Sequence, residues 1–157
     1  MNQKKHFGFS TLELLITFVI VCLLAALVVT KYSEVRQNNR DEERKADINA
    51  LQDAVETYRA ANGNYPSLNQ INTPSFRKAE LKSLDNNSLQ DPRWNKGNKA
   101  CAKGGLAILE GSTKPSAGCY GYALSPANCN NQAIVCTSYT LTAELENNQI
   151  YIKKSND

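Results

Sequence analysis

Histidine is almost absent from this chain of 157 residues, because its one histidine, His6, lies within the first eight. The rest of the chain therefore cannot build a Ser-His or Cys-His nucleophilic site, and it lacks the commonest nitrogen ligand of zinc. Residues 97–105 are basic and contain glycine, but they lack the G-x-x-x-x-G-K-[ST] spacing of a phosphate-binding loop. No pair of carboxylates is singled out by its surroundings, so we expect no enzyme activity.

A strong excess of charge of one sign is also missing. The formal net charge is +3, and the basic residues form no patch with interleaved aromatic residues, so we expect no specific nucleic-acid site. Hydrophobic residues make up 41% of the chain, but they are concentrated near the N-terminus. This distribution favours one globular domain plus a short apolar element over two large domains.

The apolar element covers residues 9–30, and Glu13 is its only charged residue. As a helix with a rise of ~1.5 Å per residue it reaches about 33 Å, enough to cross the hydrocarbon core of a membrane. Lys4 and Lys5 precede it, which favours an N-terminus held in the cytoplasm. A cleaved secretory signal should be shorter and end in a small-residue cleavage site. A plain signal anchor fits the hydropathy but leaves Glu13 unexplained, because a carboxylate at the centre of a spanning helix costs ~2.5–3.5 kcal/mol on insertion scales.

The helical pattern continues beyond this element. Residues 31–47 carry dense, nearly balanced charges, with Asp41 and Lys45 at the i, i+4 spacing of a favourable ion pair. An apolar stripe at helical spacing then follows, made by Ile48, Leu51, Val55 and Tyr58. We predict one helix from about residue 9 to about residue 61, which Gly63 and Pro66 terminate. Such a helix is natural if its first half packs against copies of itself after leaving the membrane.

The remainder predicts a small antiparallel sheet. Residues 119–124, 137–145 and 149–153 are strand-like, and residues 146–148 form a credible hairpin turn. Residues 67–105 look like a long connection, with a short helix around residues 76–84. The predicted fold class is therefore α+β, with a long N-terminal helix whose stripe packs on the sheet.

Four of the five cysteines lie in the C-terminal third of the chain, namely Cys101, Cys119, Cys129 and Cys136. An even number of cysteines in an exported domain predicts two disulfides, with three connectivities open. A zinc site with four thiolate ligands is the alternative, but its paired C-x(2-4)-C spacings are absent. We favour the pairs Cys101–Cys119 and Cys129–Cys136, since the second closes the loop of residues 130–135 at the sheet edge. Cys22, in the apolar element, is expected to stay unpaired.

Residues 8–13, Gly-Phe-Ser-Thr-Leu-Glu, follow a short basic leader and closely resemble the class III prepilin signature. The resemblance to type IV pilins implies that a prepilin peptidase cuts between Gly8 and Phe9 and N-methylates Phe9. It also implies that Glu13 meets the terminal amine of a neighbouring subunit. Opposite charges in a low-dielectric core are tolerable only when paired, so this role accounts for the carboxylate.

Two further motifs support the resemblance. Residues 58–66 resemble the Y-x-x-x-N-G-x-Y-P pattern that follows the helix in pilins and major pseudopilins. Residues 91–94 resemble the D-P-W of major pseudopilins, with Arg93 inserted. One departure is that many type IV pilins carry a proline where Thr30 aligns, whereas the first proline here is Pro66, so no proline-associated break of the helix is expected.

The implied organisation has three parts. Residues 1–8 are the leader, residues 9–30 are the transmembrane and assembly half of the helix, and residues 31–157 are an extracytoplasmic pilin domain that includes the rest of the helix. The precursor is then a single-pass membrane protein with a cytoplasmic N-terminus. Its implied partners are the prepilin peptidase, the inner-membrane assembly platform and copies of itself.

The resemblance implies a structural subunit, a type IV pilin that polymerises into a helical surface filament for adhesion, motility or DNA uptake. The alternative is a major pseudopilin of a type II secretion system, which forms a periplasmic pseudopilus. A membrane-anchored binding domain that never polymerises is a third hypothesis, but it has no use for Glu13. The pseudopilin alternative leaves calcium open as a ligand, because major pseudopilins bind it in a C-terminal loop. This sequence has no D-x-D-x-D-G loop, so we assign no metal ligands and expect no other cofactor.

The first testable prediction concerns processing. In cells with an active prepilin peptidase, mass spectrometry of the mature protein should find an N-terminus at Phe9 that carries one methyl group. The same protein from cells without the peptidase serves as the control and should begin at Met1. An N-terminus at Met1 in both strains would contradict the signature.

Overall fold

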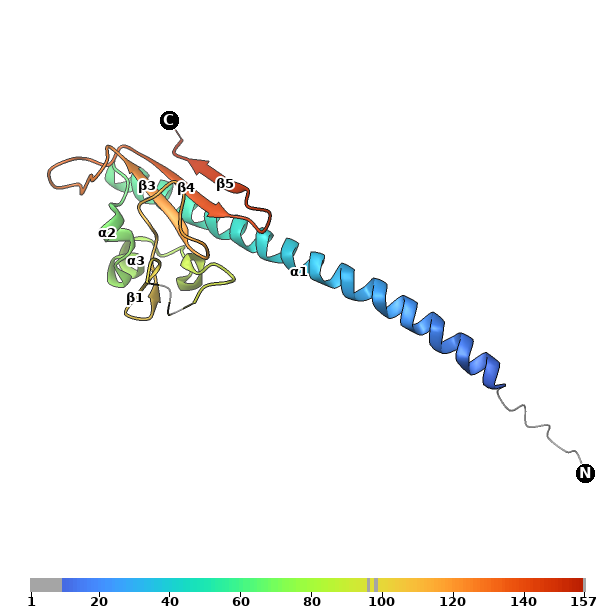
Figure 1. The fold of residues 1–157 in the computed structure, drawn as a ribbon. Coiled ribbons are helices and arrows are strands. Elements are labelled where there is room, and N and C mark those ends of the chain that lie inside the picture. The colour runs from blue at the N-terminus through green and yellow to red at the C-terminus, as the bar shows by residue number, and fades with distance from the viewer. Residues whose placement is uncertain (1–9, 96, 98, 157) are drawn as a thin grey trace, which may run out of the picture. The chain divides into compact units, whose positions relative to one another are not determined.

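The computed structural model describes residues 10–95, 97 and 99–156. The chain divides into two compact units, Met1–Asn38 and Asn39–Asp157, and helix α1 (Thr11–Asn62) contributes residues to both (Figure 1). The predicted end of the helix is confirmed, because Gly63 follows it with a left-handed φ of +77°. Glycine adopts this conformation without the steric cost that a side chain would add.

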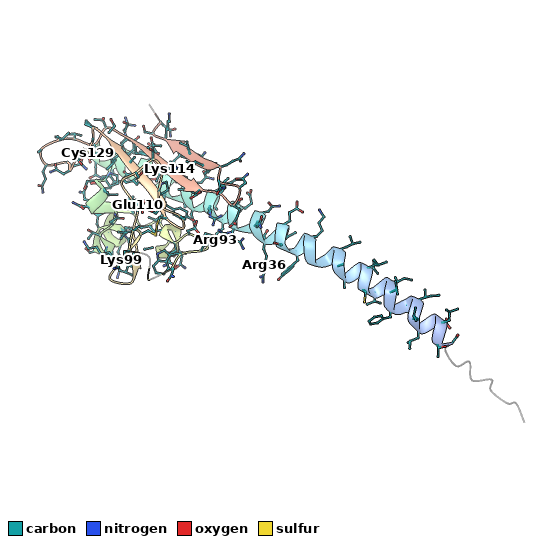
Figure 2. All side chains as sticks on the ribbon, in the orientation of Figure 1. Arg36, Arg93, Lys99, Glu110, Lys114 and Cys129 are labelled. Carbon is teal, nitrogen blue, oxygen red and sulfur yellow. A yellow bond between two sulfur atoms is a disulfide. The ribbon has the colours of Figure 1, made fainter. Side chains whose placement is uncertain are left out.

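The first unit is described as a helix that displays its side chains to solvent. Every described side chain over residues 11–27 and 31–38 is exposed, and sticks project all round this helix segment in Figure 2. In the described part of the chain, α1 is the one helix long and apolar enough to cross a membrane.

The second unit contains the predicted sheet. Strands β3 (Tyr120–Ser125), β4 (Ser138–Glu144) and β5 (Ile150–Lys154) pair antiparallel in the order β3-β4-β5, each within a residue or so of its predicted bounds. Figure 1 shows this sheet beside the second half of α1. The predicted stripe is buried there and shares one hydrophobic core with side chains of the sheet. This core includes Ile48, Leu51 and Val55 of α1 and Tyr122, Leu141 and Ala143 of the sheet. These observations confirm the α+β fold class.

The connection between the helix and the sheet has more structure than the sequence predicted. It contains α2 (Leu68–Ile71), α3 (Pro74–Glu80), the 3-10 helix η1 (Asn86–Leu89) and a hairpin of β1 (Ala102–Lys103) and β2 (Leu106–Ala107). The short helix expected over residues 76–84 is α3, which begins earlier because Pro74 occupies its first turn, where no N–H is needed. Leu81 and Leu89 hold this connection in the core.

Two disulfides tie the loops of the second unit to its sheet. Cys101 is bonded to Cys119 with their Cα atoms 5.5 Å apart, and Cys129 is bonded to Cys136 at 5.2 Å. These are the two pairs favoured from the sequence. The first links the β1 region to the start of β3, and the second closes the loop between β3 and β4. Cys22 is free and exposed.

The two disulfides should differ in their contribution to stability. They close loops with sequence separations of 18 and 7 residues, so restriction of the unfolded chain contributes about 3 and about 2.4 kcal/mol respectively. Paired serine substitution of Cys101 and Cys119 should therefore lower the free energy of unfolding more than that of Cys129 and Cys136. Denaturant titration of the full chain in neutral detergent measures the difference. Peptide mapping without reductant is the control, and four free thiols in the exported protein would contradict the pairing.

Candidate functional site

The apolar half of α1 is the most unusual surface of the molecule. Between Leu12 and Leu27 the large hydrophobic side chains are 49% exposed at the least, at Val19, and 69% at the most, at Phe18. None of them is buried by any described part of the chain. A helix that is apolar on all sides needs either a membrane or a bundle of helices around it. This segment is therefore built to be covered by something other than the described fold.

Glu13 is the exception within this surface. It stands in the first turn of α1 with its side chain exposed, and its carbonyl oxygen accepts a hydrogen bond from Thr17 Oγ1 at 2.7 Å. Over the described residues its carboxylate has no ion-pair partner. Gly8 and Phe9, the predicted processing site, lie outside the described residues, so the pairing of Glu13 with a terminal amine stays a prediction.

An ionic cluster centred on Arg44 lies within the second unit. The Arg44 side chain is only 3% exposed, although it belongs to a run of charged residues. Its Nε donates to Asp91 Oδ2 at 2.6 Å and its Nη2 to Asp91 Oδ1 at 3.1 Å, a two-pronged contact. Its Nη1 donates to Asp41 Oδ1 at 2.8 Å and to Glu146 Oε1 at 3.0 Å. Asp41 therefore pairs with Arg44, whereas the expected partner Lys45 bonds to Glu42 at 2.8 Å.

Glu146, in the β4–β5 turn, is held by the same cluster. Its side chain is 6% exposed and accepts a hydrogen bond from Arg40 Nε at 2.7 Å; Arg93 also contacts it. The hydrogen bond from Arg40, followed by those from Arg44, lowers the pKa of Glu146 to about 2. Its backbone N–H donates to Asp41 Oδ1 at 3.0 Å. The turn is thus fixed to α1 by both its backbone and its side chain.

The cluster explains the D-P-R-W segment in physical terms. Asp91 is the buried partner of Arg44, and it also accepts from the Arg93 N–H at 2.7 Å, which shapes the turn. Trp94 Nε1 donates to the carbonyl oxygen of Cys101 at 3.3 Å and so reaches the first disulfide. The segment therefore links α1 to the loop that carries the disulfide, a structural role.

A second polar network surrounds Glu56 and accounts for the other family motif. Glu56 accepts hydrogen bonds from the hydroxyls of Tyr65 at 3.1 Å and Tyr139 at 2.8 Å. The Tyr65 and Tyr139 rings pack edge to face with centroids 4.7 Å apart. Pro66 offers its carbonyl oxygen to the Tyr122 hydroxyl at 2.9 Å. The N-G-x-Y-P stretch therefore ends the helix and then seats the chain on the sheet.

Sequence reasoning missed the Arg44 cluster, although one signal was present. Arg44 lies four residues before Ile48, the first member of the apolar stripe, and so falls on the buried face of the helix. An arginine at such a position needs carboxylate partners. Within the described residues, no group of three or more histidine, cysteine or acidic side chains is arranged to hold a metal ion, so no calcium ligands are assigned.

Substitution of Glu146 tests the cluster through its pH dependence. A carboxyl whose folded pKa is lowered stabilises the fold fully above its unfolded pKa of about 4.3, and this contribution is lost as the pH falls through the folded value. Glu146→Gln should therefore lower the melting temperature at neutral pH, and the gap to the wild type should shrink between pH about 5 and about 2. Thermal unfolding of the full chain in neutral detergent, followed by near-ultraviolet circular dichroism, measures it.

The matched control is Glu144→Gln, which removes a carboxylate that has no ion pair among the described residues. It should leave the melting temperature nearly unchanged at both ends of the pH range. A gap between wild type and Glu146→Gln that stayed the same size from neutral pH to pH about 2 would contradict the assigned pairing.

Curated proteins with similar sequences carry one name, type II secretion system core protein G. The protein from Aeromonas hydrophila is 31% identical over 70 residues, 45% of this chain and 49% of the relative. That from Escherichia coli K12 is 35% identical over 66 residues, 42% and 46% of the two chains, and that from Pseudomonas aeruginosa is 31% identical over 96 residues, 61% and 63%. The chain spans about half the length of the first relatives it matches. No family model matches, and no solved structure does.

The comparisons agree with the family resemblance read from the motifs. Their shared name describes a core protein of a secretion system and names no enzyme activity. The fold agrees with this resemblance as well, because it has a long N-terminal helix packed on a small antiparallel sheet. This chain is therefore similar in sequence to the type II secretion core protein G, and its fold agrees with the resemblance to the type IV pilin and pseudopilin family.

Proposed function

We propose that this protein is a major pseudopilin of a type II secretion system. The observation that carries the proposal is the similarity to core protein G, over about half of the length of those proteins. The exposed apolar half of α1 supports it, because such a surface suits a subunit that moves from a membrane into a helical filament. The filament would be a periplasmic pseudopilus.

The surface pilus, which the sequence analysis favoured, fits the comparisons only at the level of the family. Core protein G is the name of the four curated relatives that match, and none of these four is named as a pilin of a surface fibre. The D-P-R-W segment also favours the secretion alternative, since it resembles a major pseudopilin motif and here supplies the buried partner of Arg44. A secretion pseudopilus is therefore proposed in place of a surface fibre.

The proposed assembly needs an interaction beyond the hydrophobic effect. Lipid tails are as apolar as the leucines of the helix, so moving it from bilayer to helix bundle gains little from apolar burial. Close packing and polar contacts between helices must supply the difference. Glu13 is the one charged group of the segment, and we assign it to the methylated amine at Phe9 of a neighbouring subunit after cleavage behind Gly8.

A secretion assay separates the two filament types. Deletion of the gene should abolish release of type II substrates into the medium and leave surface fibres and twitching motility intact. The deletion strain complemented with the wild-type gene is the control. Loss of surface fibres with normal secretion would contradict the pseudopilin proposal and favour a pilus.

Glu13→Leu tests the proposed assembly contact. Membrane insertion should become easier because the only charge of the apolar segment is gone, and cleavage should continue because it depends mainly on Gly8. Filament yield should fall, because the amine at Phe9 would be buried without its anionic partner, at a cost of ~3–5 kcal/mol per broken pair. Sheared filaments are quantified under overexpression, with subunit levels measured in the membrane fraction.

Thr17→Val is the matched control for Glu13→Leu. It removes a polar atom one turn further along the same helix without changing charge, and its hydroxyl bonds only to the backbone of Glu13 among the described residues. Its filament yield should stay near that of the wild type. Normal filament yield from Glu13→Leu, at normal subunit levels, would show that the carboxylate has no role in assembly.

A further inference from the structure

Helix α3 carries a buried arginine that has no part in the proposed function. The Arg77 side chain belongs to the last turn of α3, and the residue is 6% exposed. Its Nη1 donates to the carbonyl oxygen of Ile71 at 2.8 Å. Its Nε is buried and has no hydrogen-bond partner among the described residues. At least one buried donor of this guanidinium is therefore unfilled within the described residues.

No carboxylate compensates the charge of Arg77. It makes no salt bridge within the described residues, and burial alone lowers its pKa below the usual range. Glu80, the one acidic residue of α3, is exposed. Burial is the main cause of the raised pKa of Tyr58, and the negative charge of Glu80 raises it further. Arg44 has the opposite surroundings, since three carboxylates bond to it. A buried cation without an anion is unfavourable, and the described chain supplies no anion to Arg77.

Arg77 lines a cavity of about 400 Å³, a volume within the range of small-molecule sites. The lining consists of Pro74, Arg77, Lys78, Leu81, Lys82 and Leu84. Three of these side chains are cationic and none is acidic. The other three are apolar, so the lining combines positive charge with hydrophobic surface.

We propose that Arg77, Lys78 and Lys82 form a binding site for a phosphate group that is carried by a small organic molecule or by a lipid. The planar fork of a guanidinium matches phosphate oxygens in two places at once, and the lysines add point charges. A phosphate monoester carries about two negative charges at neutral pH and so balances three cations better than a single carboxylate does, whereas a lipid phosphodiester carries one charge and relies on the same forked contact with the guanidinium. Pro74, Leu81 and Leu84 would contact the organic part of the ligand.

The test uses the full chain labelled with ¹⁵N in neutral detergent micelles. The Arg77 Nε–Hε signal, assigned by its absence from the spectrum of Arg77→Lys, is followed by NMR. One arm adds inorganic phosphate and then glycerol 3-phosphate at constant ionic strength. The other arm compares nanodiscs of phosphatidylcholine with nanodiscs that also contain phosphatidylglycerol. We expect a saturable shift in one arm, and the arm in which it occurs distinguishes a soluble phosphate ester from a lipid headgroup.

Lys78→Ala/Lys82→Ala is the variant that tests the site, because both lysines are exposed and their loss leaves the core intact. It should weaken the binding on the order of tenfold. Lys103→Ala/Lys114→Ala removes the same charge from exposed positions outside the cavity lining and should bind as the wild type does. No saturable shift in either arm would overturn the proposal, as would equal weakening by the two double variants, which indicates charge screening alone.

Discussion

The Arg44 guanidinium lies in the interior of the second unit, and it can remain there because three carboxylates surround it. Removing water from a charge costs several kcal/mol, so each carboxylate must be delivered to its place by the segment that carries it. Asp91 fixes the loop after η1 beside Arg44, and Glu146 fixes the β4–β5 turn there. The position of the β4–β5 turn then determines how β4 and β5 lie along α1. An apolar contact at Arg44 would tolerate sliding of these segments, whereas a forked ion pair at 2.6 and 3.1 Å does not.

The two halves of α1 meet opposite physical demands. The half within Asn39–Asp157 has an apolar face and a polar face, and its apolar face is buried by the sheet of its own chain. The half within Met1–Asn38 is apolar on every side up to Leu27, and the described chain covers none of it. A soluble monomer has no stable place for such a segment. The same helix therefore contains a folded-domain part, complete in itself, and a part that is complete only in a membrane or among other helices.

Local patterns in the sequence were enough to predict α1 and the three-stranded sheet, but not the short elements between them or the ionic contacts between distant segments. The helix end followed from Gly63 and Pro66, and the strands followed from alternation, because both signals lie within a few neighbouring residues. Two of the three partners of Arg44 lie 47 and 102 residues away along the chain, and no local pattern in the sequence can predict a contact over such a distance. The sequence around Arg77 is typical of an exposed cation on a short helix, and only the packing of the connection shows that it is buried. The β1–β2 hairpin has two residues in each strand, too few for any alternation to appear.

Glu13 has a different energetic meaning in each environment that the proposed function gives it. Near the end of a spanning helix, a carboxylate can reach the interfacial water, so its cost in the membrane is modest. In the interior of a filament that water is gone, and the same charge needs a cation of its own. Apolar packing between such helices is nearly without register, because one leucine or valine contact resembles the next. A single charged group that requires one partner removes this freedom, so under the proposed function the carboxylate that is tolerated in the membrane would set how far one subunit stands from the next.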